Sequence, residues 1–508
     1  MPDARAVDLD GASLAVADVV AVARHRARVT ISESARERMR ESAAVVHDIV
    51  ARNEVVYGVT TGFGKLSDIA IPPERLAELQ VNLVRSHAVG VGPRMSEAEV
   101  RAMMLLRANV LARGYSGARP AIVDLLAGML DAGLYPPVPE QGSVGASGDL
   151  APLAHLALAL IGEGELLRAD SAGPAAEMLR AHALEPVVLG PKEGISLING
   201  TQAHTAIAAL LAHDAGVLCR AAHVAAAMSL EALMGTPVAF DERIHDARGQ
   251  RGQRESARAM RRLLAGSEIR ESHRTGDRRV QDAYGLRCVP QVYGSVLDAL
   301  HFVEEVVGRE LNAATDNPLV VPGGEMLSGG NFHGQPVAMA LDFLAIALTN
   351  LAVMSERRTD RLVHPDLNEG LPPFLSTDAG TSSGFMMAQV TAAALASECK
   401  VLAHPASVDT IPTDGNKEDV VPMAMGAAWK ARRVLENARR VIAIELMCAA
   451  QGVDFRAPLA PGAGVARAHG CVRAVVPRLE RDRVLSGDVE TLAGAIADGV
   501  FDDCFEER

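Results

Sequence analysis

Aromatic residues are scarce in this chain of 508 residues: Phe, Trp and Tyr together make 3%, with one Trp and five Tyr. Alanine-rich stretches are common instead, and they favour helices, so we predict a mostly α-helical globular protein. Cysteine is also rare. The six cysteines include no C-x-x-C pair and no spacing typical of a zinc site, so we expect reduced thiols, a cytoplasmic protein and no bound metal.

Positive charge is not in excess either, since the formal net charge is −13. A general nucleic-acid binder needs the opposite balance, so we expect no nucleic-acid partner. The arginine-rich stretch 248–279 is interpreted as a solvated pair of charged helices. No signal-peptide-like apolar segment occurs near the start, which argues against secretion. The most apolar run, residues 336–354, contains Asp342 and Asn350 and is interpreted as a buried core helix, with no membrane partner.

Long Ala- and Leu-rich helical patterns dominate the second part of the chain. We expect them at residues 202–234, 290–313, 336–357, 384–403 and 421–451. Helices that are apolar nearly all round must be buried against one another, so we predict a long central helical bundle over residues 201–508. Residues 1–200 are predicted to form a smaller N-terminal domain with few strands. In that domain, the capping box Ser34-x-x-Glu37 predicts the start of a helix.

A turn of small residues precedes the apolar run 150–161: Gly142-Ser143-Val144-Gly145-Ala146-Ser147-Gly148-Asp149. Its centre, Ala146-Ser147-Gly148, can form an electrophile from its own backbone. Attack of the Gly148 nitrogen on the Ala146 carbonyl carbon closes a five-membered ring as water leaves, and glycine leaves room for this approach. Loss of the Ser147 hydroxyl as a second water then gives 4-methylideneimidazol-5-one. Asp149 is predicted to cap the helix that follows.

This turn, with Leu150-Ala151-Pro152-Leu153-Ala154-His155 after it, resembles the cofactor-forming segment of the aromatic amino acid ammonia-lyases and aminomutases, most of all that of the histidine-specific enzymes. The resemblance runs from about residue 55 to about residue 455. It implies a carbon–nitrogen lyase that uses the ring formed from Ala146, Ser147 and Gly148 and needs no external cofactor. It also implies a homotetramer whose active sites combine segments from more than one subunit, and broad apolar helix faces favour such association.

Tyr57 lies in a glycine-rich loop, Val55-Val56-Tyr57-Gly58-Val59-Thr60-Thr61-Gly62-Phe63-Gly64-Lys65. A phosphate-binding loop is excluded, because Val59 and Leu66 stand where G-x-x-x-x-G-K-[ST] needs Gly and Ser or Thr. The loop resembles the family's tyrosine-bearing loop, which makes Tyr57 the expected general base for the β-proton of the substrate. A phenolate is strong enough for this role if neighbouring charges and helix dipoles lower its pKa.

Further strings match the family in its order along the chain. They supply Asn199, Gln281, Tyr284, Arg287 and Phe332. By resemblance, Asn199 contacts the cofactor carbonyl or the substrate carboxylate, and Phe332 lies near the cofactor. Arg287 suits the substrate carboxylate, because a planar guanidinium makes two parallel hydrogen bonds to it and stays charged at any working pH.

Two residues bear on the choice of substrate. His87 follows Ser86 as in the histidine-specific enzymes. Glu418 stands where those enzymes carry Glu and the phenylalanine and tyrosine enzymes typically carry Gln. A carboxylate can accept a hydrogen bond from an imidazole N–H, whereas beside a phenyl ring it would lose its hydration without a new partner. His87 and Glu418 are therefore expected to bind an imidazole at its two ends.

Several positions depart from the histidine-specific pattern, and Val59-Thr60 resembles the phenylalanine and tyrosine enzymes instead. The other departures are Gly285, Cys399, Lys417, Val420 and Pro422. Three hypotheses therefore remain open. The leading one is an ammonia-lyase that converts L-histidine to trans-urocanate. The second is a tyrosine or phenylalanine ammonia-lyase, or a 2,3-aminomutase, with the same cofactor. The third is a catalytically silent helical scaffold.

Overall fold

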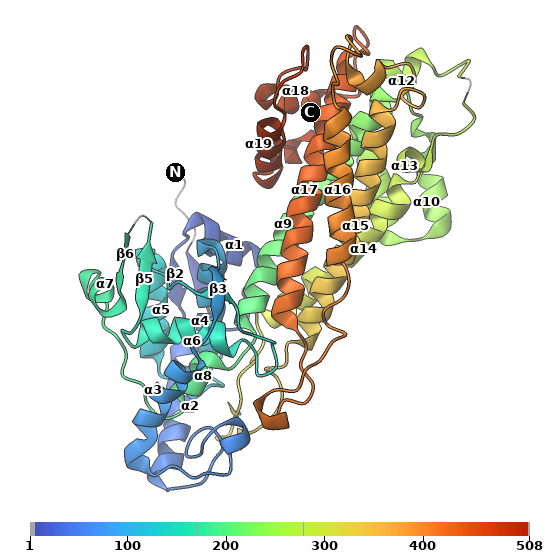
Figure 1. Ribbon diagram of the computed structural model, residues 1–508. Helices are drawn as coiled ribbons and strands as arrows, with labels where there is room; N and C mark the ends of the chain where they lie inside the picture. Colours follow the sequence, from blue (N-terminus) through green and yellow to red (C-terminus); the bar gives the residue numbers. More distant parts are fainter. Residues whose placement is uncertain (1–5, 170, 278, 506–508) are drawn as a thin grey trace. The chain divides into compact units, whose positions relative to one another are not determined.

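The computed structural model describes residues 6–169, 171–277 and 279–505. The fold is mostly α-helical, as predicted (Figure 1). In this described part, the strands pair into four two-stranded sheets, of which only the first is parallel. The strands are β1 (Val7–Leu9), β2 (Val29–Ile31), β3 (Val91–Arg94), β4 (Pro139–Gln141), β5 (Glu165–Arg168), β6 (Ser171–Pro174), β7 (Leu319–Val320) and β8 (Met326–Leu327).

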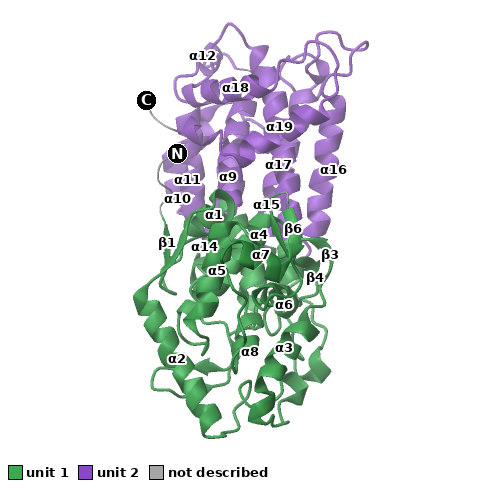
Figure 2. Ribbon diagram, turned by 90° about the vertical axis from the view of Figure 1, so that its left-hand side faces the viewer, with its two compact units in different colours: residues 1–213, 304–342, 405–429 green, residues 214–303, 343–404, 430–508 purple. Residues whose placement is uncertain are grey.

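The chain divides into two compact units (Figure 2). Unit 1 contains residues 1–213, 304–342 and 405–429, and unit 2 contains residues 214–303, 343–404 and 430–508. Unit 1 thus continues past residue 200 and takes in two later segments of chain. Four of the five boundaries fall inside a long helix (α9, α14, α15 or α17), so these helices contribute residues to both units.

Shorter helices make up most of unit 1. They are α1 (Val16–His25), α2 (Glu33–Ala51), α3 (Leu76–His87), α4 (Glu97–Ala112), α5 (Pro120–Ala132), α6 (Leu150–Leu160), α7 (Ala175–Ala181) and α8 (Glu193–Ile198). Helix α2 is capped by Ser32, whose hydroxyl accepts a hydrogen bond from the Ala35 N–H at 3.2 Å. The capping box predicted at Ser34 is therefore wrong, because Ser32 has the extended backbone that an N-cap needs and Ser34 is already helical.

Two contacts of α6 determine where the reactive turn lies. Helix α6 follows the small-residue turn and packs against both α3 and α8. Helix α8 ends at Ile198, immediately before Asn199 and Gly200. The packing of α6 on α8 therefore brings together two segments that are about fifty residues apart in the chain.

Longer helices characterise unit 2. They are α9 (Gln202–Ala232), α14 (Val289–Glu310), α15 (Gln335–Val363), α16 (Met386–Leu402) and α17 (Ala424–Asp454), with the shorter α10 (Glu242–Arg248), α11 (Arg251–Leu263), α12 (Glu268–Ser272), α13 (Tyr284–Arg287), α18 (Ala463–Val475) and α19 (Ser486–Ala497). Arg251, Arg254 and Arg261 on α11 form ion pairs at 2.9–3.3 Å with acidic neighbours. The basic stretch is thus a pair of charged surface helices, as interpreted from the sequence.

A buried polar cluster joins four of the long helices. The Glu445 carboxylate of α17 accepts hydrogen bonds from Ser229 of α9 and Ser355 of α15, each at 2.6 Å. It also pairs with Arg358 of α15 at 2.5 and 2.8 Å, and Arg358 donates to the Tyr293 hydroxyl of α14. Because a buried charge left without its partner is strongly destabilising, these contacts favour one alignment of the helices.

Among the residues that the structure describes, two helices, α9 and α15, are long and apolar enough to cross a membrane, judged by length and composition only. In the protein, 78% and 72% of their most apolar windows are buried. The run 336–354 thus lies in a mostly buried helix, as predicted from the sequence.

Candidate active site

The turn predicted to form the ring is pressed against the segment that follows α8. Gly148 has φ +74°, in the left-handed region, and a Cβ atom there would lie 2.0 Å from the Gly200 carbonyl oxygen. The Gly200 N–H donates to the Ser147 carbonyl (3.3 Å), and the Asp149 N–H donates to the Gly200 carbonyl (2.7 Å). Only glycine fits at position 148, so two backbone segments meet there with no side chain between them.

Asp149 does not cap α6 as predicted, although it directly precedes the helix. Its side chain makes no capping hydrogen bond. Instead, the carboxylate accepts hydrogen bonds from the Ser143 hydroxyl (2.8 Å) and the main-chain N–H of His204 (2.9 Å). It also lies 2.8 Å from the His204 ring nitrogen Nδ1. Burial alone would raise the pKa of Asp149, but its contacts with His204 and Ser143 outweigh burial and lower it. A fully buried carboxylate needs such fixed partners, and here they tie both ends of the turn to α9.

Ser147 has polar partners on two sides. Its carbonyl oxygen accepts a hydrogen bond from the side-chain amide of Asn199 (2.9 Å), which is 4% exposed. Its hydroxyl donates to one oxygen of the Glu418 carboxylate. The other carboxylate oxygen accepts from the Thr413 hydroxyl. Three residues predicted from separate strings, Ser147, Asn199 and Glu418, are thus in direct contact.

Two cavities of unit 1, of about 520 and 510 Å³, are both lined by Ser147. Most of the predicted site residues of this unit line one cavity or both: Tyr57, His87, Ala146, Ser147, Asn199, Phe332 and Glu418. Tyr57 and Glu418 line both. The structure therefore places the residues expected to act as the base, to form the ring and to select the substrate around the cavity of about 510 Å³.

Tyr57 is half-buried beside acidic groups. Burial raises the pKa of its phenol, the hydrogen bond from the Gly64 N–H (3.4 Å) opposes that increase, and the negative charges of Asp414 and Glu418 add to it. The net pKa is raised. The condition stated for a phenolate base, a pKa lowered by neighbouring groups, is therefore not met by the groups of this chain, because burial and the nearby carboxylates both raise the pKa.

His87 presents a defined tautomer to the second cavity. Its Nδ1 lies 2.8 Å from the Leu83 carbonyl oxygen, which can only accept a hydrogen bond. The hydrogen of a neutral ring is therefore on Nδ1, and Nε2 is the acceptor. An acceptor is what a substrate N–H needs as a partner.

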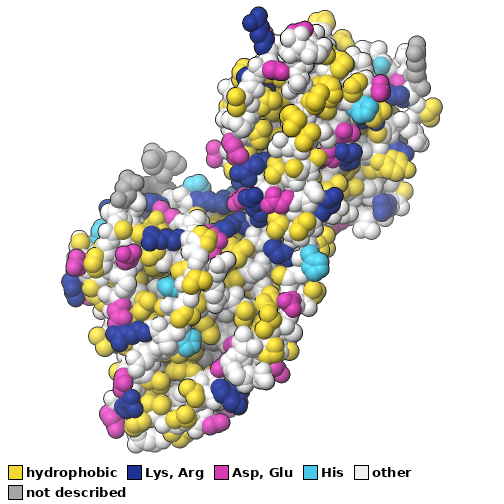
Figure 3. Space-filling view, viewed as in Figure 1, with side chains coloured by type: hydrophobic (Ala, Val, Ile, Leu, Met, Phe, Trp, Pro, Cys, Tyr) yellow, Lys and Arg dark blue, Asp and Glu magenta, His cyan; other side chains and the backbone are white. Residues whose placement is uncertain are grey.

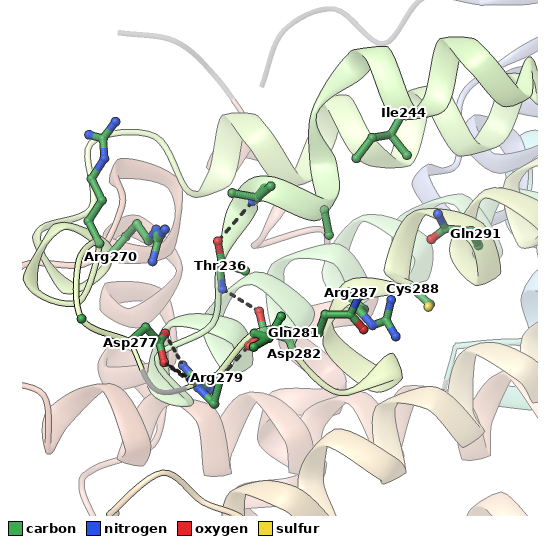
Figure 4. Close-up of a pocket in the computed structure, with 15 residues that line it drawn as sticks. Thr236, Ile244, Arg270, Asp277, Arg279, Gln281, Asp282, Arg287, Cys288 and Gln291 are labelled. Carbon is green, nitrogen blue, oxygen red and sulfur yellow. Dashed lines mark hydrogen bonds and ion pairs between the residues drawn. The ribbon is translucent and has the colours of Figure 1, made fainter.

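The second predicted segment lies in unit 2. Gln281 and Arg287 line a cavity of about 620 Å³ whose described walls all belong to unit 2 (Figure 4). Tyr284 is 69% exposed, and the Arg287 guanidinium carbon lies 4.5 Å from the centre of its ring, within the range of a cation–π contact. None of these three residues is among the described residues that line the cavities at Ser147.

Hydrogen bonds hold the backbone of this second segment. The Asp282 carboxylate accepts from the Thr236 N–H at 2.7 Å and lies 3.5 Å from Arg279 Nη1 (Figure 4). The buried Arg358 guanidinium donates to the Gly285 carbonyl at 3.3 Å. The backbone is thus fixed, while Tyr284 at its surface stays open to solvent.

The sequence patterns did not single out Asp414 or Thr413. Asp414 lines both cavities beside Tyr57, and Thr413 donates to Glu418. Asp414, Gly415 and Asn416 all have positive φ, at 47°, 58° and 66°. An Asp-Gly-Asn string is typical of such turns, and its place two residues before Glu418 is the signal that could have identified both residues.

Comparisons with known proteins agree with these features. The model of the aromatic amino acid lyase family matches residues 14–474. A histidine ammonia-lyase from Koribacter versatilis (strain Ellin345) is 52% identical, over 97% of this chain and 98% of the relative. The crystal structure of tyrosine aminomutase from Streptomyces globisporus superposes with a TM-score of 0.94 at 39% identity, covering 98% of each chain. That of histidine ammonia-lyase from Trypanosoma cruzi does so with a TM-score of 0.92 at 42% identity, covering 99% of this chain and 95% of that one.

The resemblance found in the turn and in the separate strings is thus confirmed over nearly the whole chain. Likenesses of this extent in both sequence and fold leave no room for a match limited to short motifs, and the chain belongs to the aromatic amino acid lyase family.

Proposed function

We propose that the protein is a histidine ammonia-lyase, which eliminates ammonia from L-histidine and releases trans-urocanate. The observation that carries this proposal is the cavity of about 510 Å³ in unit 1, where His87 and Glu418 line the same space as Ser147. Both side chains accept hydrogen bonds, so together they match the two N–H groups of a protonated imidazole ring, which a phenyl ring lacks. Family membership supports the type of reaction, and the name of the curated relative from Koribacter versatilis supports the substrate.

The residues at the turn fit formation of a 4-methylideneimidazol-5-one ring. Gly148 is in the left-handed region with no room for a Cβ, and Asn199 donates to the Ser147 carbonyl. Ring closure forms a bond from the Gly148 nitrogen to the Ala146 carbonyl carbon, and the carbonyl oxygen leaves as water with the hydrogens of the Gly148 and Ser147 nitrogens. The second water takes the Ser147 hydroxyl and the hydrogen on its Cα. No oxidant or external cofactor is needed.

Once formed, the ring supplies an electron-poor carbon that binds the substrate through its amine or its aromatic ring and makes ammonia a better leaving group. Tyr57 removes the β-proton. Its phenolate is stabilised by the Gly64 N–H, but the carboxylates near it act in the opposite direction. A cation brought near Tyr57 in the assembled enzyme would lower its pKa, and the substrate's own ammonium group is one such cation.

Glu418 gains a free oxygen when the ring forms. One of its oxygens accepts from the Ser147 hydroxyl and the other from Thr413. Because the first of these hydroxyls leaves as water, that oxygen becomes available to accept from the substrate imidazole. His87 Nε2 is an acceptor in the same cavity. Maturation of the turn therefore also prepares the substrate pocket.

Arg287, with Gln281 and Tyr284, binds the substrate carboxylate in this proposal. Tyr284 is 69% exposed, and the family resemblance implies shared active sites, so we propose that a neighbouring copy supplies these residues in a homotetramer. Apolar side chains exposed on α14, α15 and α16 support association. They are Phe302, Phe343, Met387, Val390 and Val401, each at least 44% exposed. Figure 3 shows hydrophobic side chains on the face where these helices are seen in Figure 1.

Two further proposals follow from the sequence. Residues 1–200 act as the domain that provides the tyrosine loop and the ring-forming turn, and residues 201–508 act as the bundle that assembles the tetramer. A cytoplasmic location is supported by the cysteines, which are all free thiols.

A second candidate function is a 2,3-aminomutase or lyase acting on tyrosine or phenylalanine. The structural neighbour named tyrosine aminomutase favours it, as do Lys417 and Val420, which depart from the histidine-specific pattern and line the cavity at Ser147. Val59, another departure, is fully buried among Val46, Ile49 and Val320. Since Val59 packs into this apolar cluster, it has no direct bearing on substrate choice.

Mass spectrometry tests the cofactor directly. The purified chain should weigh two waters less than its sequence requires, with the loss confined to the peptide that contains residues 146–148. Ser147→Ala should restore one or both waters and abolish turnover. An unmodified peptide in natively folded wild-type protein would contradict the mechanism for every substrate.

Glu418→Gln tests the substrate. Loss of a hydrogen bond to a charged group lowers kcat/KM for L-histidine by about ten- to a hundredfold if the bond is made in the transition state. The peptide with two waters lost should remain. Tyrosine, phenylalanine and their β-amino acid products are assayed beside histidine. A wild-type preference for tyrosine, or unchanged histidine turnover in the variant, would favour the second candidate.

A further inference from the structure

Arg107 is a fully buried cation that the proposed catalytic steps do not use. It lies in α4 and is 0% exposed. Its Nη1 donates to the carbonyl oxygens of Ser196 and Asn199, each at 3.0 Å, and its Nη2 donates to the side-chain oxygen of Gln202. One guanidinium thus holds the end of α8 and the start of α9.

The charge of Arg107 persists despite burial. Burial lowers its pKa to about 10, while the carboxylates of Asp316 and Asp149 favour the charged form. It therefore stays protonated near neutral pH. Its hydrogen-bond partners are neutral oxygens, and a cation buried among such partners is costly. Removing it would leave several buried acceptors without a donor.

Gly200 connects Arg107 to the ring-forming turn. It has φ +144°, and a Cβ atom there would lie 2.8 Å from Arg107 Nη2 and 2.5 Å from the Gln202 side-chain oxygen. The Gly200 carbonyl is the oxygen that a Cβ on Gly148 would meet at 2.0 Å. Gly200 therefore lies directly between the guanidinium and the turn.

Asn199 provides a parallel connection. Its main-chain carbonyl accepts from Arg107, and its side-chain amide donates to the Ser147 carbonyl at 2.9 Å. Gln202 is held in turn, because its amide donates to the Thr315 hydroxyl at 2.8 Å. The orientation of Asn199 relative to Ser147 thus depends on a main chain that Arg107 fixes.

We propose that Arg107 is a positioning residue for ring closure, because it presses Asn199 and Gly200 against the turn from which the ring forms. The inference rests on the proposed formation of the ring from Ala146, Ser147 and Gly148. Arg107 makes and breaks no covalent bond. It acts by keeping the Gly148 nitrogen close to the Ala146 carbonyl carbon while the first water is lost.

Arg101 provides a matched control on the same helix. It too is 0% exposed, and it donates to the main-chain carbonyls of Val22 (2.9 and 3.3 Å) and Leu130 (3.0 Å). None of these contacts involves residues 146–148 or 196–202. Arg101→Met should therefore remove as much buried charge and hydrogen bonding as Arg107→Met, without touching the wall behind the turn.

The experiment measures ring formation by mass and not only by activity. Full-length wild type, Arg101→Met and Arg107→Met are expressed, and the peptide containing residues 146–148 is weighed at a series of times after synthesis. Loss of hydrogen bonds to a charged group should slow the two-water loss by about tenfold or more in Arg107→Met. In wild type and Arg101→Met the loss should be equally fast.

Arg107→Lys covers the case in which Arg107→Met does not fold. A single ammonium keeps the charge but cannot reach all three acceptors in the guanidinium geometry, so dehydration should be intermediate in rate. Dehydration at the wild-type rate in folded Arg107→Met or Arg107→Lys would overturn the inference, and so would an equal slowing in Arg101→Met. If the wild-type peptide itself keeps both waters, the proposed function fails instead.

Discussion

The two sets of predicted site residues differ in how the fold holds them. Around Ser147, side chains are fixed from several directions: Asn199 is 4% exposed, and Glu418 bonds two hydroxyls. Around Arg287, the backbone is held through Asp282, but Tyr284 is 69% exposed. The first set shows what a single chain can complete by itself. The second is presented at a surface, where we propose that a neighbouring copy completes the site.

This difference corresponds to a difference in chemistry. In the proposed mechanism, ring closure occurs within one chain, because the atoms that react belong to three successive residues, 146–148. The residues that pack against this turn and hold its atoms close together, such as Gly200, therefore have to be in place when the chain folds. Binding of a substrate carboxylate happens only in the mature enzyme, so its arginine can come from another copy.

The largest expected effect comes from separating the two sets by mutation. Tyr57→Phe removes the proposed general base and Arg287→Met removes the proposed ligand of the substrate carboxylate, and each should lower kcat/KM by about 10²–10⁴-fold. When the two variants are refolded together, the Tyr57→Phe chains keep an intact Arg287 set and the Arg287→Met chains keep an intact Ser147 set. If sites are shared between copies, about one quarter of them should be intact in a random mixture. Activity of the mixture is the measurement.

A matched pair of variants within one set provides the control. Tyr57→Phe mixed with Asn199→Ala should recover nothing, because both residues line the same cavity of one chain. Recovery in this control, or its absence in the first mixture, would show that the two sets are not divided between copies.

The sequence predicted the elements of both sets better than their contacts. The long helices follow from apolar periodicity, and Tyr57, Asn199 and Arg287 follow from strings that match the family. The partner of Asp149 could not be read locally, because His204 lies 55 positions further along the chain. From its position before an apolar run, Asp149 was predicted to cap a helix. Its buried carboxylate instead needs a fixed partner, which the packing of the turn against α9 supplies.

The same limit applies to Tyr57. Its loop predicts a reactive tyrosine, but its pKa is raised by burial and, in addition, by the charge of Asp414, which lies more than 350 residues away. Contacts that set electrostatics are often of this non-local kind. Arg107 is a further case, since an arginine within a mostly apolar helix gives no sign of the three oxygens to which it donates hydrogen bonds.

A smaller effect distinguishes residues that bind the side-chain ring of the substrate from residues that bind its carboxylate. His87→Phe removes a neutral acceptor, which should lower kcat/KM for histidine by about three- to tenfold and raise the relative rate with phenylalanine. Arg287→Lys should weaken every amino acid alike, because the carboxylate is common to all of them. Steady-state kinetics with both substrates make the comparison. If kcat/KM fell equally for both substrates in His87→Phe, residues other than His87 would recognise the side-chain ring of the substrate.

The smallest expected effect concerns the pH dependence of the Ser147 set. Tyr57 acts as a base only when deprotonated, so kcat/KM should fall as the pH drops through its pKa. The carboxylate of Asp414 raises that pKa. Asp414→Asn removes the negative charge, which lowers the pKa and moves the acid limb of the profile to lower pH. At a fixed pH on that limb, kcat/KM should rise by about two- to fivefold.

Asp419→Asn is the control, because Asp419 lines the same cavity but is not among the groups that shift the Tyr57 pKa. A limb that moves to higher pH in Asp414→Asn, or moves equally in both variants, would mean that Tyr57 is not the titrating base. A limb that moves to lower pH only in Asp414→Asn would show that Tyr57 is the titrating base and that the charge of Asp414 raises its pKa.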